Sequence, residues 1–138
     1  MDALPPYEFA FPGPLRDKLV AAVLSGAKTS TTGLFRAYEV EGEALPRVGA
    51  RFAVVDSEER PVAVVEITDV RVLPLGEVDL EHAVDEGEGY ASVAQWRAAH
   101  ERFWNGEELR GFLKDPGFVV EDDTLVVAER FRVVPYNS

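Results

Sequence analysis

The fold is decided by residues 51–67, RFAVVDSEERPVAVVEI, in which two apolar, β-branched runs flank a short polar segment. Valine and isoleucine favour extended backbone because their branched side chains pack well on a pleated surface. A polar segment between two such runs is typical of a hairpin. The sequence therefore predicts antiparallel strands at 51–55 and 62–67, and the second strand is expected to continue toward Val72.

A second pair of apolar runs lies near the C-terminus. Residues 119–120 and 125–128 flank the polar segment EDDT, and alternating apolar residues continue from the second run to Val134. This pattern predicts another hairpin followed by a long last strand. A further strand is expected at 29–35, where threonines follow one another.

Apolar residues recur at helical spacing before and between these strands. The first such stretch begins with Pro14, which suits a first helical turn, and is followed by Gly26, which favours a helix end. A later one follows Ser92, which with Gln95 matches a capping box. Helices are predicted for residues 14–25, 80–85, 93–104 and 107–113, with a short one between 38 and 45.

Hairpins with helices inserted between them are typical of an α+β fold, and here they predict a small mixed barrel. The chain has 138 residues, which suits one hydrophobic core, and no repeat, linker or low-complexity segment divides it. We therefore expect a single domain spanning residues 1–138.

The chain carries a net charge of −11, which disfavours binding to double-stranded DNA or to a long RNA because the phosphate backbone would be repelled. The charge is uneven, since residues 1–36 hold four basic and three acidic side chains. A small cleft of neutral or basic character can therefore accept a nucleoside or a short single-stranded RNA.

Several other classes of protein are also disfavoured by composition. The chain has no cysteine, which excludes a disulfide scaffold and a thiolate metal site. No stretch approaches the roughly twenty apolar residues of a membrane span, and the N-terminus lacks the pattern of a signal peptide. We expect a cytoplasmic protein that does not bind membranes.

Lys28 stands among hydroxyl side chains in GAKTSTTG, residues 26–33, directly after the first predicted helix. An amine partly withdrawn from water has a lowered pKa and can act as a base. A structural role fits the same residues, because the helix dipole favours lysine near a helix C-terminus and threonine suits strands. The stretch by itself leaves both interpretations open.

A second polar group is HAVDEGEGY, residues 82–90. Glycines on both sides of Glu88 allow sharp turns, which let the nearby acidic side chains point into a cleft. Residues 77–108 hold nine acidic and two basic side chains, so a solvated acidic loop is the alternative. A glutamate that reaches Lys28 would favour a functional site.

Four segments in sequence order together resemble the ASCH domain, over about residues 9–134. They are residues 26–31, 82–90, 96–104 and 126–134. The resemblance implies a PUA-like β-barrel with flanking helices and an association with RNA and nucleosides. The chain departs from the compact bacterial relatives at Ser30 and Gly33 and in its extra helical region, 96–112.

Those compact relatives hydrolyse N4-acetylcytidine to cytidine and acetate. The resemblance implies that Thr31 is the nucleophile here, that Lys28 is its base, and that Glu86 orients the lysine or carries a proton to the leaving amine. Neither a metal nor a cofactor is expected. Substrate-binding roles are expected for five neighbouring polar residues, Thr29, Ser30, Arg36, Glu88 and Tyr90.

Two other functions would use the same cleft. In a ribonuclease, Lys28 and Arg36 would hold a phosphate while Glu86 or His100 activates the ribose 2′-hydroxyl. A non-catalytic module would bind a modified nucleoside or an RNA end.

His82 and His100 fit ordinary structural positions better than catalytic ones, and a metal site at His82, Glu86 and Glu88 matches no established spacing. The helical spacing of Trp96, Phe103 and Trp104 favours core packing over base stacking.

Overall fold

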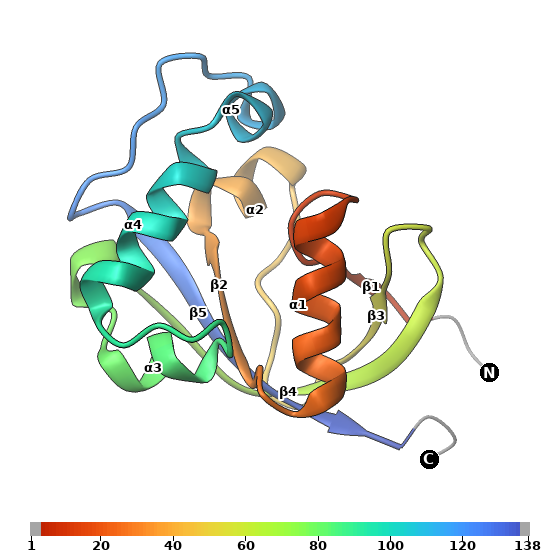
Figure 1. Cartoon of the computed structure of the whole chain (residues 1–138). Coiled ribbons are helices and arrows are strands. Elements are labelled where there is room, and N and C mark those ends of the chain that lie inside the picture. Colours follow the sequence, from red (N-terminus) through yellow and green to blue (C-terminus); the bar gives the residue numbers. More distant parts are fainter. Residues whose placement is uncertain (1–3, 136–138) are drawn as a thin grey trace.

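The computed structural model describes residues 4–135, which form a mixed β-sheet surrounded by helices (Figure 1). The strands are β1 (Pro6–Tyr7), β2 (Ser30–Leu34), β3 (Arg51–Val55), β4 (Pro61–Pro74) and β5 (Leu125–Val134). The helices are α1 (Pro14–Ser25), α2 (Phe35–Glu41), α3 (Leu80–Asp85), α4 (Val93–Trp104) and α5 (Glu107–Leu113), with the 3-10 turn η1 at Leu75–Glu77. None of these helices combines the length and apolarity that crossing a membrane requires.

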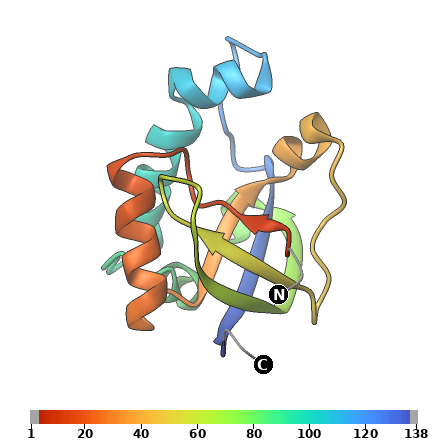
Figure 2. The same ribbon diagram turned by 90° about the vertical axis from the view of Figure 1, so that its right-hand side faces the viewer.

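The five strands lie in the order β1-β3-β4-β5-β2. Only the short β1 runs parallel to its neighbour, and the other pairs are antiparallel. The long strand β4 curves along its length, with a register irregularity between Ile67 and Asp69, so that the sheet bends into a half-barrel (Figure 2). Its two edge strands, β1 and β2, do not pair with each other, and α1 connects them along the chain (Figure 1).

The structure confirms the α+β class and most of the predicted elements. The hairpin of β3 and β4 pairs Phe52 with Val65, and β4 extends two residues beyond Val72. Ser92 caps α4 as expected, because its Oγ accepts from the Gln95 N–H at 3.1 Å. The Gln95 side chain accepts from the Ala91 N–H at 2.8 Å, one residue before the N-cap, so the reciprocal bond of a capping box does not form.

Two elements differ from the expectation: the short helix is present but shifted, and one predicted strand does not form. The expected short helix begins earlier, directly after β2, as α2. Residues 119–120 form no strand. Strand β5 pairs with β4 on one side and with β2 on the other, which leaves no position beside it for a hairpin partner. Val120 is instead buried in the core, and its N–H donates to Asn105 Oδ1 at 2.9 Å.

The core has two parts. One lies where α4 and α5 pack on the sheet, and it includes the fully buried Trp96 and the nearly buried Trp104, as their helical spacing predicts. The other lies between α1 and the sheet and includes Val23, Val65 and Phe131. The site described below lies between these two parts.

A close backbone contact holds the segment after α3 against the start of β2. The Thr29 N–H donates to the Asp85 carbonyl at 2.8 Å. A Cβ atom at Gly87 would lie 2.6 Å from the backbone carbonyl of Ala27 and 2.7 Å from Lys28 N. Gly87 and Gly89 both have positive φ, as the sharp turns expected around Glu88 require, but Gly89 has open space around it.

This contact makes Gly87→Ala and Gly89→Ala a matched pair. Gly89→Ala carries only the conformational cost of a positive φ, about 1–2 kcal/mol of unfolding free energy. Gly87→Ala adds a backbone clash, for a total of about 2–5 kcal/mol. Urea unfolding of both variants checks this, and equal losses would contradict the close approach.

Candidate functional site

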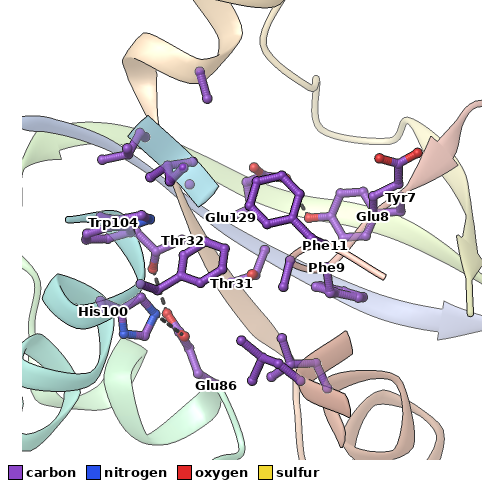
Figure 3. Close-up of a pocket in the computed structure, with 18 of the residues that line it drawn as sticks. Tyr7, Glu8, Phe9, Phe11, Thr31, Thr32, Glu86, His100, Trp104 and Glu129 are labelled. Carbon is purple, nitrogen blue, oxygen red and sulfur yellow. Dashed lines mark hydrogen bonds and ion pairs between the residues drawn. The ribbon is translucent and has the colours of Figure 1, made fainter. Parts of the chain in front are cut away.

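A pocket of about 690 Å³ lies between the edge strands β1 and β2, where the half-barrel stays open. Its walls come from residues 6–11, from β2, and from side chains of α1, α2, α4 and α5 (Figure 3). The volume falls within the range of small-molecule sites. Six glutamates line it, whereas its lysines and arginines are Lys18, Lys28 and Arg102, so the lining is acidic.

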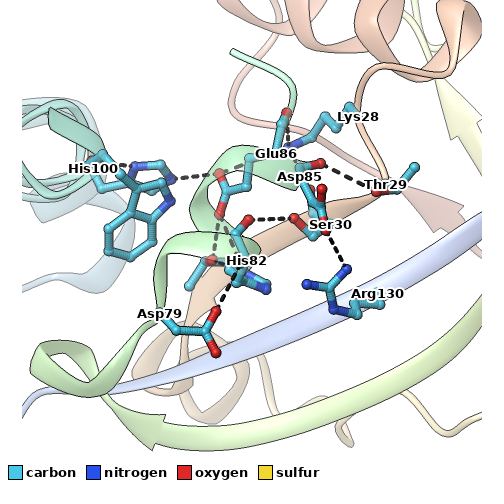
Figure 4. Close-up of polar contacts among 11 residues, drawn as sticks. Lys28, Thr29, Ser30, Asp79, His82, Asp85, Glu86, His100 and Arg130 are labelled. Carbon is cyan, nitrogen blue, oxygen red and sulfur yellow. Dashed lines mark hydrogen bonds and ion pairs between the residues drawn. The ribbon is translucent and has the colours of Figure 1, made fainter. Parts of the chain in front are cut away.

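Lys28 lies on the pocket wall with only 2% of its surface exposed. The chain reaches it through Gly26, whose left-handed conformation ends α1, and the Lys28 N–H then donates back to Ala22 O at 3.0 Å. Its Nζ donates to Ser30 O at 2.9 Å and Glu86 O at 3.4 Å (Figure 4). Burial lowers the pKa of this amine, although the nearby Glu86 and Glu88 carboxylates act in the opposite direction.

Glu86 follows α3 and is 1% exposed. Its Oε1 atom lies 4.0 Å from Lys28 Nζ and 3.0 Å from His100 Nε2. Its Oε2 atom accepts a hydrogen bond from Thr32 Oγ1 at 2.6 Å and lies 3.5 Å from His82 Nε2. Burial alone would raise the pKa of this carboxyl. Hydrogen bonds from the two histidines and the charge of Lys28 outweigh burial, so the pKa lies well below its usual range.

Both histidines contact Glu86. His100 stacks on Trp96, and both of its ring nitrogens face acceptor oxygens, since Nδ1 lies 2.9 Å from the Trp96 carbonyl and Nε2 lies 3.0 Å from Glu86 Oε1. Thr32 gives its one hydroxyl proton to Glu86 and therefore accepts from His82 Nε2 at 2.7 Å. This assigns the Nε2–H tautomer to His82 and leaves its buried Nδ1 unpartnered among the described residues.

Three hydrogen bonds hold helix α3 in place and so fix the position of Glu86, which follows it (Figure 4). Asp79 caps the helix by accepting from the His82 N–H at 2.9 Å. The Ser30 hydroxyl donates to the His82 carbonyl at 2.9 Å, and Arg130 of β5 donates to Asp85 at 2.8 Å.

Thr31 and Thr32 point to opposite faces of β2, as successive strand residues do. Thr32 reaches Glu86 and His82, whereas Thr31 lies opposite Glu129 in the register of β2 and β5. Thr31 lines the pocket, and within residues 4–135 its hydroxyl makes no hydrogen bond. It is therefore free to contact a ligand.

A second buried carboxyl lies in the pocket at Glu129, which is 2% exposed (Figure 3). Tyr7 OH donates to its Oε1 at 2.5 Å and Tyr38 OH to its Oε2 at 2.6 Å. Burial raises the pKa of Glu129 more than the two hydroxyls lower it. The sequence analysis missed this group, although alternation with the apolar Val127 and Phe131 is a signal that residue 129 points inward.

The expected substrate-binding residues divide into two sets. Glu88 and Tyr90 line the pocket, where burial and the Glu88 charge raise the pKa of the Tyr90 hydroxyl. The other three do not line it. Thr29 and Ser30 bind the backbone of α3. Arg36 pairs with Asp115 at 3.0 Å and lies over the Phe118 ring.

One set of side chains in the described part of the chain could hold a metal ion. Glu86, Glu88 and His100 each offer one ligand atom, and these atoms lie within 4.8 Å of one another. The Glu86 carboxylate already contacts Lys28, Thr32 and both histidines, so a metal ion would compete with these side chains for its oxygens.

The charge of Glu86 gives a prediction for stability against pH. Because the folded state lowers its pKa, Glu86 stabilises the fold above the ordinary glutamate pKa of about 4.3, and this contribution is lost as pH falls further. Glu86→Gln is expected to lose about 3–5 kcal/mol at pH 7, because Lys28 is left without its partner, and measurably less near pH 3, where the carboxyl of the unfolded chain is largely protonated. Urea unfolding at both pH values measures the difference, and a difference independent of pH would contradict the ionised Glu86.

The chain is similar to known proteins over nearly its whole length. The ASCH domain family model matches residues 8–135. A crystal structure of a protein from Enterococcus faecalis V583 is 28% identical, with a TM-score of 0.82, and the match covers 97% of this chain and 78% of that one. An ASCH domain from Lactobacillus crispatus JV V101 is also 28% identical, with a TM-score of 0.79 and coverage of 95% and 79%.

A search of curated proteins found no match. The structural neighbours agree with the α+β, PUA-like fold that the sequence resemblance implied. The family model covers nearly all of the residues that form the sheet, the helices and the pocket. The chain therefore belongs to the ASCH domain family.

Proposed function

We propose that the protein is an amidohydrolase that removes an acyl group from the exocyclic amine of a nucleoside, with N4-acetylcytidine as the model substrate. The observation that carries the proposal is the almost complete burial of Lys28 beside Glu86, in the wall of a pocket that also presents the free Thr31 hydroxyl. Both side chains line one pocket, and an amine with a lowered pKa can serve as the base that activates a hydroxyl nucleophile.

The reaction has two stages. The neutral form of Lys28, which its lowered pKa makes accessible from the ammonium, takes the Thr31 hydroxyl proton while Thr31 Oγ1 bonds to the acyl carbon, which forms a tetrahedral intermediate. The carbon–nitrogen bond then breaks, and the lysine ammonium returns the proton to the leaving amine. Water attacks the resulting threonine ester and gives its proton to Lys28, the acid is released, and Lys28 returns the proton to Thr31.

Glu86 positions Lys28 in this scheme, because its backbone carbonyl accepts from Nζ and its carboxylate lies 4.0 Å away. The N–H groups of Lys28 and Thr29 are not available to an oxyanion, since they donate to Ala22 and Asp85. The ammonium formed on Lys28 in the first step supplies the positive charge beside the developing oxyanion.

The charge of the pocket favours an uncharged nucleoside over RNA. Six glutamates line the pocket, and they disfavour the entry of a phosphate chain. The ribonuclease alternative calls for Lys28 and Arg36 to share a phosphate, but Arg36 lies outside the pocket beside Asp115. Ribonuclease activity and binding without turnover are therefore outcomes of the test below, not second proposals.

Substitutions at three positions test the catalytic assignment. Lys28→Met is expected to lower kcat for N4-acetylcytidine by about 10²–10⁴, the usual contribution of a general base, and Thr31→Val to abolish the acyl-enzyme. Thr29→Val is the matched control, because Thr29 lies outside the pocket, and it should stay within about threefold of wild type. Chromatography of products and mass spectrometry of quenched enzyme give the readouts.

Other results would redirect the assignment. Loss of the acyl-enzyme in Thr32→Val but not in Thr31→Val would assign the nucleophile to Thr32. Cleavage of a short single-stranded RNA without deacylation would contradict the amidohydrolase, and repeating the reaction with EDTA would show whether a metal takes part. Saturable nucleoside binding without turnover would indicate a binding module.

A further inference from the structure

Glu129 is a buried acid whose hydrogen-bond partners among residues 4–135 are two neutral phenols. Tyr7 of β1 and Tyr38 of α2 donate to its two oxygens at 2.5 and 2.6 Å. Within residues 4–135 it has no ion pair, although it is 2% exposed. A carboxylate without a cation is costly to bury, and three elements far apart in sequence converge to hold this one.

The position of Glu129 relates it to the proposed nucleophile. Thr31 and Glu129 are directly opposite in the register of β2 and β5, and both line the pocket. Residues opposite each other on one face of an antiparallel pair have Cβ atoms about 4.5–5.5 Å apart. A ligand whose acyl carbon lies at Thr31 therefore presents its adjoining atoms to Glu129.

We infer that Glu129, held in place by Tyr7 and Tyr38, determines specificity by hydrogen bonding to a ring nitrogen and the neighbouring exocyclic N–H of a planar heterocycle. The inference rests on the proposed function and deepens it. In an N4-acylated cytosine, the ring nitrogen N3 and the N4–H adjoin the scissile amide. N3 accepts a hydrogen bond and the N4–H donates one, so the protein group that binds them must offer a donor and an acceptor side by side.

A protonated carboxyl group supplies that pair. Its hydroxyl donates to the ring nitrogen, and its carbonyl accepts from the exocyclic N–H. Burial raises the pKa of Glu129 and so favours this neutral form. The walls suit a flat ring as well, because Phe9 and Phe11 line the same pocket (Figure 3). Phe103 lines it too.

Equilibrium binding to the intact protein tests the inference independently of catalysis. The ligands are cytidine and 3-deazacytidine, which differ in the ring nitrogen. By calorimetry, the wild type is expected to bind cytidine about tenfold more tightly or better, as the loss of a buried hydrogen bond predicts. Glu129→Leu should bind both ligands equally, whereas Glu129→Gln, which keeps a donor and an acceptor, should retain the preference.

Tyr38→Phe provides a variant that keeps the carboxyl if Glu129→Leu does not fold, and it should reduce the preference by severalfold. A cytidine preference that persists in folded Glu129→Leu, or a wild type that binds neither ligand, would overturn the inference. Deacylation of N4-acetylcytidine with no cytidine preference would overturn it while leaving the proposed function intact. A Glu129-dependent preference without deacylation would overturn only the proposed function.

Discussion

The burial of Lys28 against Glu86 is the constraint on which the rest of the site depends. Removing two charges from water costs several kcal/mol for each, and mutual attraction repays this only when neighbouring groups complete the hydrogen bonds. Those neighbours come from different elements: the Ser30 carbonyl and Thr32 hydroxyl from β2, His82 from α3 and His100 from α4. The position of each element is thereby coupled to the state of the pair.

The pocket exists because the sheet closes only part of the way. Its edge strands β1 and β2 stay apart, and helices fill the sides of the opening without covering it. Two buried glutamates with oppositely shifted pKa values line this pocket. Contacts with cationic or donating groups keep Glu86 ionised, whereas the hydrogen bonds to Glu129 in the described part of the chain come from two phenol hydroxyls, and burial raises its pKa. Such a division suits a site where one wall performs chemistry and the other recognises the substrate.

Much of the fold could be predicted from local sequence signals. The bounds of α1 and α4 follow from end signals and helical spacing, and the β3–β4 hairpin follows from β-branched runs. The prediction of a strand at residues 119–120 was wrong for a non-local reason, because β5 already has strand partners on both sides. In the site, glycines around Glu88 and the family resemblance indicated Lys28 and Glu86. The roles of Thr32, His82, His100 and Glu129 depend on strand register and helix placement, which sequence patterns do not fix.

The protonation of Lys28 tests the account most directly. Nuclear magnetic resonance of the side-chain nitrogen, followed against pH and assigned with Lys28→Met, reports its pKa in the intact protein. The account predicts a value below the ordinary lysine pKa of about 10.4, because burial outweighs the attraction of Glu86 and Glu88. A value at or above the ordinary one would mean that Lys28 is a permanent ammonium that holds the structure together and is not a base.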